Sequence, residues 1–144
     1  MPVEPRIFHF PQGIPGFETH QEFKFIPEED PLFAQLISVK EEEVGFILLR
    51  PEVYFLEYLK ELDVDEESIK VLNVHADVLV DVWVILTLNR QDLNKTTANL
   101  RAPILFNSAE GIGMQVILND DRYLSSQPLF TEGNQKPLQE GAVG

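Results

Sequence analysis

The chain has 144 residues, the length of one ordinary domain, and contains no cysteine, which excludes disulfides and thiolate metal sites. Eleven basic and 24 acidic residues give a formal net charge of −13, so the chain repels nucleic acid and anionic membranes and attracts basic partners. We therefore expect no direct binding to nucleic acid or membrane. No apolar run approaches the roughly 18 residues of a membrane span, and residues 1–6 lack a secretory-signal layout, so a cytoplasmic location is expected.

Strand patterns dominate the start of the chain. Residues 7–10 are an apolar strand candidate, and residues 11–16 are so dense in Pro and Gly that they must form a turn or loop. Residues 22–26 alternate polar and apolar side chains, which indicates a half-buried strand. The apolar runs 33–39 and 44–49 are separated by Lys-Glu-Glu-Glu, which predicts a hairpin with a charged tip that opposes edge-to-edge pairing.

The middle of the chain combines helix and strand signals. Residues 51–62 fit either an amphipathic helix begun by Pro51 or an aromatic strand. Asp65 is a candidate N-cap for a short helix over residues 66–72. Residues 78–88 are the strongest strand in the chain, and Asp81 near their middle implies that one face is wet.

The remaining elements complete a mainly β pattern. Residues 103–106 and 114–118 read as two strands joined by a glycine turn, whereas residues 131–144 are too polar to fold alone and are expected to be a flexible C-terminal tail. Residues 1–130 are expected to form one domain. Seven or so short strands with one or two short helices predict a small antiparallel β-barrel or barrel-like sandwich, whose core ten Phe residues can fill.

Patterns of catalytic or cofactor-binding residues are missing from the sequence. His9, His20 and His75 lie in unrelated segments without metal-ligand spacing, and residues 111–113, Gly-Ile-Gly, lack the third glycine of a dinucleotide loop. A Gly-x-Ser-x-Gly elbow is absent, and the two acids at 120–121 are too few oxygen ligands for a hard cation. We expect no enzymatic activity, no metal and no cofactor.

Two segments resemble motifs of a known family. Residues 10–18 read Phe-Pro-Gln-Gly-Ile-Pro-Gly-Phe-Glu, similar to the Phe-Pro-x-Gly-(Ile/Leu)-x-Gly-Phe-Glu loop of the flagellar assembly factor family FliW. Residues 97–107, Thr-Ala-Asn-Leu-Arg-Ala-Pro-Ile-Leu-Phe-Asn, and residues 115–123, Gln-Val-Ile-Leu-Asn-Asp-Asp-Arg-Tyr, resemble its second signature. Order and spacing agree from about residue 7 to residue 129. Residues 56–58, Leu-Glu-Tyr, depart from a Pro-Asp-Tyr common in the family.

The resemblance implies a non-enzymatic switch between two protein partners. FliW-like proteins bind the RNA-binding regulator CsrA, which stops it repressing translation of flagellin mRNA, and they also bind flagellin, whose accumulation withdraws them from CsrA. An acidic chain suits a basic RNA-binding partner, and we expect a monomer in the absence of partners. The resemblance also favours an extended run before Asp65 over a helix at 51–62. An alternative is a small-ligand-binding β-barrel, since closed barrels can hold cargo.

Candidate partner-binding residues fall into three patches. The first is the 10–18 loop, which could present Ile14 and Phe17, although Phe10 and Phe17 could instead close one end of the barrel. Residues 28–70 hold 13 acidic and four basic residues, an excess that forms either a docking face for a basic protein or a solubilising surface. Within this segment, residues 41–43 are a further candidate patch, with a solvated hairpin tip as the alternative.

The remaining patch is the 119–121 turn, whose acids could pair with Arg or Lys of a partner. Asn119 is expected to bond the turn backbone, and Asn99 and Asn107 to bond backbone where strands end. The complete set of candidates is Gln12, Ile14, Pro15, Phe17, Glu18, Glu41, Glu42, Glu43, Asn119, Asp120 and Asp121.

Overall fold

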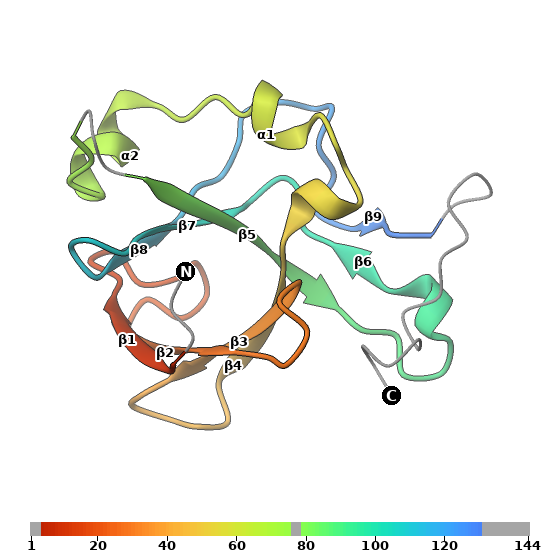
Figure 1. Cartoon of the computed structure of the whole chain (residues 1–144), viewed down its shortest axis with the longest axis horizontal. Helices are drawn as coiled ribbons and strands as arrows, with labels where there is room; N and C mark the ends of the chain where they lie inside the picture. The colour runs from red at the N-terminus through yellow and green to blue at the C-terminus, as the bar shows by residue number, and fades with distance from the viewer. Residues whose placement is uncertain (1–3, 76–78, 131–144) are drawn as a thin grey trace.

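A computed structural model describes residues 4–75 and 79–130, and in them seven strands close a β-barrel (Figure 1). Around the barrel, β4 neighbours β3, then β2, β1, β8, β7 and β5, and β5 pairs with β4 to close the ring. The predicted mainly β fold is confirmed. The barrel strands are β1 (Arg6–His9), β2 (Glu22–Pro27), β3 (Phe33–Ser38), β4 (Gly45–Leu49), β5 (Val80–Thr87), β7 (Ile104–Asn107) and β8 (Ile112–Gln115).

Two features of the sheet were not expected from the sequence. One neighbouring pair, β1 and β8, is parallel rather than antiparallel, with His9 opposite Ile112. In addition, β6 (Thr97–Ala98) pairs with the end of β5, and β9 (Gln127–Pro128) pairs with β6, which extends the sheet away from the barrel at the right of Figure 1. The predicted tail, residues 131–144, lies outside the described residues.

Short helical turns lie at the top of the view in Figure 1, above the barrel. The segment 51–62 is neither one helix nor the extended run that the family resemblance favoured: it holds a 3₁₀ turn, η1 (Pro51–Val53), and one helical turn, α1 (Tyr58–Glu61). A tertiary contact decides this, because the buried Tyr58 hydroxyl donates to Leu100 O at 2.6 Å. No helix of the described residues combines the length and apolar character that crossing a bilayer needs.

The predicted helix after Asp65 is confirmed as α2 (Glu66–Val71). Asp65 takes the N-cap position with extended backbone, but its side chain makes no cap hydrogen bond, so the expected capping contact is wrong in that detail. A further 3₁₀ turn, η2 (Leu93–Lys95), is capped by the side chain of Asp92, which accepts from Asn94 N.

Aromatic side chains fill the barrel interior. Phe8 packs edge-on against Phe106 with ring centroids 4.8 Å apart, and Phe25 packs edge-on against both Phe106 and Trp83 at 5.3 Å. Such edge-to-face pairs stabilise the fold by more than the burial of their apolar area alone. The Arg50 guanidinium lies 4.4 Å from the ring centroid of the buried Trp83 and 3.9 Å from Asp81, whose side chain is 35% exposed. Asp81 lies two residues before Trp83 and therefore on the same face of β5. Within β5 only Thr87 is exposed, so the wet face predicted for this strand is wrong.

The hairpin of β7 and β8 differs in its boundaries from the prediction. The second strand begins at Ile112 and ends at Gln115, rather than covering 114–118. Gly113 allows this early start because a Cβ at that position would collide with the ring of the fully buried Phe10. Beyond Gln115 the chain remains hydrogen-bonded to the residues that precede β7, since Val116 N donates to Pro103 O and Leu118 N donates to Arg101 O.

Candidate functional site

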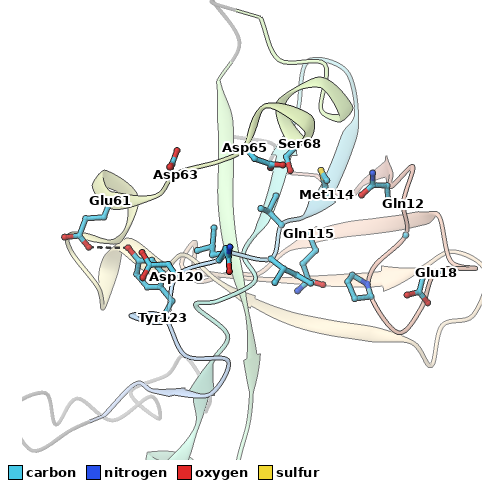
Figure 2. A pocket seen from close by; sticks show the side chains of 16 residues that line it. Gln12, Glu18, Glu61, Asp63, Asp65, Ser68, Met114, Gln115, Asp120 and Tyr123 are labelled. Atoms are coloured by element: carbon cyan, nitrogen blue, oxygen red, sulfur yellow. Dashed lines mark hydrogen bonds between the residues drawn. The ribbon is translucent and has the colours of Figure 1, made fainter.

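A groove of about 680 Å³ runs along one end of the barrel (Figure 2). Residues 114–120, the end of β8 and its continuation, run along the groove. Gln12, Gly13, Pro15 and Glu18 line it at one end, and the stretch from α1 into α2 lines it from the opposite end, at Glu61, along its upper side in Figure 2. The groove therefore joins two of the three patches that the sequence singled out, the 10–18 loop and the 119–121 turn.

Five carboxylates from three separate parts of the chain line this groove. Figure 2 shows Glu18 and Gln12 at the right, Asp63 above, and Glu61 beside Asp120 at the left. The fifth carboxylate is Asp65, next to the buried Ser68. None of the described lining residues is Lys or Arg, so the groove has a strongly negative wall on an open surface. Such a surface suits ammonium and guanidinium groups.

The 10–18 loop places Glu18 by means of two glycines in the left-handed region. Gly13 has φ +65°, and a Cβ there would lie 2.8 Å from the Cα of Glu18. Gly16, at φ +91°, donates its N–H to Glu18 Oε2 at 3.1 Å. This hydrogen bond lowers the pKa of Glu18, so the carboxylate keeps its charge to a lower pH than an ordinary glutamate does.

Within the same loop, Ile14 is not available to a partner. Its side chain is 2% exposed and packs in the aromatic core, so its assignment to a partner surface is wrong: an apolar side chain beside Phe10 and Phe23 is more stable inside. Phe17 is 36% exposed and packs edge-on against Phe46. Phe17 covers the core from outside while presenting one side to solvent, whereas Phe10 is fully buried in the barrel core.

In the 119–121 turn, both acids already have cationic neighbours in the chain. Arg122 Nη2 donates to Asp120 Oδ2 at 2.8 Å, and these contacts with Arg122 lower the pKa of Asp120. Arg122 also lies 3.5 Å from Glu61, and Arg101 lies 3.4 Å from Asp121. A basic partner would therefore compete with Arg122 for Asp120 and with Arg101 for the fully exposed Asp121, and their role in partner binding stays a prediction.

The side chains of Asn99, Asn107 and Asn119 were expected to hydrogen-bond to backbone, and this holds for Asn99 and Asn107. The turn bond predicted for Asn119 is made by Asp120 Oδ1 instead, which accepts from Arg122 N at 2.9 Å. Asn99 Oδ1 accepts from Ala102 N, and Asn107 Nδ2 donates to Leu72 O, so both bond backbone as predicted.

The hairpin tip lies apart from the groove. Glu41, Glu42 and Glu43 are exposed at the turn between β3 and β4 and do not line the groove. Figure 1 shows this hairpin at the bottom of the view, away from α1 and α2 at the top. The third patch is therefore a separate acidic surface.

Sequence reasoning missed Glu61, Asp63 and Asp65 as site residues. A signal was present, since all three belong to the acid-rich segment 28–70. What the sequence did not reveal is that this segment folds back over the turn that follows β8. Asp63 and Asp65 are exposed and, like Glu18, have no ion-pair partner among the described residues, so these three charges are available to a ligand in the groove.

The histidines do not join this site. His20 is buried, and its Nδ1 lies 2.7 Å from Ser38 Oγ; His9 lies 3.5 Å from Glu22. In the part of the chain that the structure describes, no group of three His, Asp or Glu side chains is arranged to hold a metal ion. The groove thus offers an acidic surface of defined shape.

Comparison with known proteins identifies the family. The family model described as FliW protein matches residues 3–129. A flagellar assembly factor FliW of Clostridium botulinum is 39% identical over 130 residues, covering 90% of this chain and 89% of the relative. One of Geobacillus thermodenitrificans is 40% identical over 129 residues, covering 90% and 88%. A crystal structure of the flagellar assembly factor FliW aligns with a TM-score of 0.79 at 39% identity over 88% of this chain and 86% of the other. The chain therefore belongs to the FliW family of flagellar assembly factors.

Proposed function

We propose that this chain is a non-enzymatic antagonist of a CsrA-type RNA-binding regulator, relieving repression of flagellin mRNA, and that it binds flagellin in a partner switch. The observation that supports this most is the convergence of Glu18, Asp63 and Asp65 on one open groove. A regulator that binds RNA carries a basic surface, and the groove is its electrostatic complement. The switch would operate in the cytoplasm, where the mRNA is translated.

Antagonism follows from the charge of the bound chain. With a net charge of −13, it would repel the phosphate backbone of an mRNA from any surface to which it is docked. The same charge opposes self-association, so we propose a monomer that pairs with basic partners. Flagellin would withdraw the chain from the regulator by binding the same chain more tightly or in larger amount.

The test is a pair of matched charge reversals. Asp63→Lys with Asp65→Lys removes two groove carboxylates that have no ion-pair partner among the described residues, whereas Glu42→Lys with Glu43→Lys makes the same change in net charge at the hairpin tip. Titration calorimetry with a purified CsrA-type regulator and with flagellin measures each affinity. We expect the affinity of the groove variant to fall at least about tenfold, which corresponds to about 1.4 kcal/mol of binding free energy. The affinity of the tip variant should fall less than about fivefold.

Ionic strength provides a second readout on the wild-type chain. Affinity for the regulator should fall steeply between about 0.01 M and 1 M salt, as the Debye length shrinks from about 30 to 3 Å. Equal losses in the two reversal variants would mean that the overall field, not the groove, carries recognition. Failure of the wild-type chain to bind either the regulator or flagellin would overturn the proposed function.

The alternative of a small-ligand barrel receives no support from the interior. Phe8, Phe10, Phe23 and Trp83 are at most 1% exposed and occupy the barrel core. A ligand would have to displace this close-packed aromatic cluster, at a cost of several kcal/mol for each large side chain moved.

A further inference from the structure

The floor of the groove is an open sheet edge. Beyond Gln115 the chain stays extended and is bonded on one side only, to residues 101–103. Because successive residues of a strand direct their N–H groups to opposite sides, the bonds of Val116 N and Leu118 N leave Ile117 N–H and Asn119 N–H directed away from β7. Among the described residues these two N–H groups have no hydrogen-bond partner.

The edge is open because β1 leaves the sheet early. β1 pairs with β8 at a single register position, His9 with Ile112. The chain then turns at once, since Gly13 N donates to Phe10 O at 2.9 Å, and Pro11 within this turn has no N–H to offer a neighbour. Past the turn, the position of the next strand beside 115–119 is occupied by the groove, with Gln12 and Pro15 also lining it.

This edge lacks the usual protection against pairing. Natural edge strands are shielded by Lys, Pro, bulges or a covering segment, but here the outward residue is Ile117, whose side chain is 63% exposed. The exposed apolar side chain and the two free donors together present the features that an added strand requires.

We propose that an extended, basic segment of a partner protein binds in this groove as an additional strand, paired with Gln115–Asn119 through main-chain hydrogen bonds. At about 3.3 Å per residue, five residues of the partner span the edge. Its Lys or Arg side chains reach Glu18 at one end and Asp63 and Asp65 along the side that is uppermost in Figure 2. This inference rests on the groove's being the partner site of the proposed function and adds how the partner is held.

Charge selects the occupant. Residues 131–144 of the chain itself carry Glu132, Lys136 and Glu140, a net charge of −1, and a second copy carries −13. Both would bring negative charge to a groove lined by carboxylates. In a suitable segment of another protein, Lys or Arg alternates with β-branched residues. The basic side chains then pair with the carboxylates of the groove, and the β-branched residues favour the extended conformation that pairing with the edge requires.

The decisive variant is Ile117→Pro, with Ile117→Ala as its matched control. Both remove the exposed isoleucine side chain, but only proline removes the outward N–H, and an edge position tolerates proline because that N–H has no internal partner. Circular dichroism and the melting temperature establish that each variant is folded. The probes are the CsrA-type regulator, flagellin and a nonapeptide of alternating Lys and Val, measured by titration calorimetry.

We expect Ile117→Ala to bind within about threefold of wild type and Ile117→Pro to bind at least about tenfold more weakly, since a main-chain hydrogen bond is lost and the ring blocks approach. The same nonapeptide with N-methyl groups at every second residue tests the mode without altering the protein, and it should not bind. Amide hydrogen exchange at Ile117 and Asn119 should be fast in the free chain and slowed in the complex.

The outcomes separate this inference from the proposed function. If the regulator or flagellin binds wild type but Ile117→Pro binds as well as Ile117→Ala, or the two amides stay unprotected in the complex, strand addition is overturned while the function stands. If the nonapeptide binds and its methylated form does not, yet neither protein binds, strand addition stands and the function fails. A nonapeptide that does not bind overturns the inference for an extended basic segment.

Discussion

The side chain of Asn107 ties the barrel to the end of α2: its Nδ2 donates to the carbonyl oxygen of Leu72 at 2.7 Å. The same amide reaches Asn73 O at 3.3 Å, and its Oδ1 accepts from Glu110 N at 3.2 Å. Carbonyls at a helix C-terminus lack partners within the helix, and Asn73 has φ +57°, which turns the chain there. One fully buried amide thus holds α2, and with it Asp65, over the groove.

Replacement of Asn107 should therefore destabilise the fold more than replacement of other amides. We expect Asn107→Ala to lower the free energy of unfolding by about 1–3 kcal/mol, because buried backbone groups are left without partners. Asn99→Ala is the control, since that side chain accepts one hydrogen bond, from Ala102 N, and should cost about 0.5–1.5 kcal/mol. Urea denaturation measures both, and equal losses would contradict this role of Asn107.

Substitutions in the 10–18 loop should show by their effect on stability which side chains belong to the core and which to the surface. Ile14→Asp places an unpaired charge in the aromatic core and should abolish or nearly abolish cooperative unfolding. Phe17→Ala removes a half-exposed ring and should cost less than the roughly 3–5 kcal/mol of a fully buried Phe→Ala change such as Phe10→Ala. Thermal melts of the three variants test this order, and a Phe17→Ala variant as unstable as Phe10→Ala would contradict it.

Arg122 partly neutralises the groove, so its removal should strengthen binding of a basic partner. Arg122→Gln frees Asp120 and Glu61 from their internal cation and should raise affinity for the regulator by up to about fivefold at low salt. Lys60→Gln is the control, because Lys60 pairs 3.9 Å from Glu57 and does not line the groove. Binding kinetics at low and high salt measure the effect, and weaker binding of Arg122→Gln would show that the arginine itself contacts the partner.

The same variant should change the titration of Asp120. In the wild-type chain the hydrogen bonds from Arg122 lower the pKa of Asp120 below its ordinary 3.8. A carboxyl group with a lowered folded pKa contributes stability above its unfolded pKa and loses that contribution as pH falls through the folded pKa. NMR titration of the side-chain carboxyl between about pH 2 and 6 should show the pKa of Asp120 rising in Arg122→Gln; an unchanged value would contradict the cause assigned to it.

Tyr58 should make the fold sensitive to alkali. Its hydroxyl is buried against Leu100 O, and burial raises the pKa of Tyr58 well above the ordinary 10.0. The folded chain therefore holds this proton more tightly than the unfolded chain. The contribution of the protonated Tyr58 to the free energy of unfolding is fully present below about pH 10. It is lost as pH rises toward the folded pKa, by up to about 1.4 kcal/mol per pH unit.

Melting temperatures from about pH 8 to 11 measure this loss. Tyr58→Phe should be less stable at neutral pH, by about 0.5–1.5 kcal/mol for the hydroxyl bond, yet its stability should fall less steeply with pH. Some slope should remain, because the pKa of Tyr123, packed edge-on against Tyr58, is also raised by desolvation. Equal slopes in the two proteins would assign the alkaline transition to other groups.

Local patterns predicted much of the barrel because short-range sterics decide them. Period-two alternation marked β2, apolar runs with an acidic break marked the hairpin of β3 and β4, and Pro and Gly marked the loop after β1. The same loop, read with residues 97–123, also indicated the family, which the comparisons confirm. Each of these signals lies within a few tens of residues.

The sequence by itself thus determined the β class, most strands, the short helix α2 and the family. Only the tertiary structure decided the site, because convergence depends on which strands become neighbours. The early exit of β1 opens the edge at Ile117, and the fold of residues 51–65 brings Asp63 and Asp65 to a turn more than fifty residues later in the chain. Folding also placed Ile14 inside and paired Asp120 with Arg122, since burial and ion pairing follow from distances in space that local periodicity does not encode.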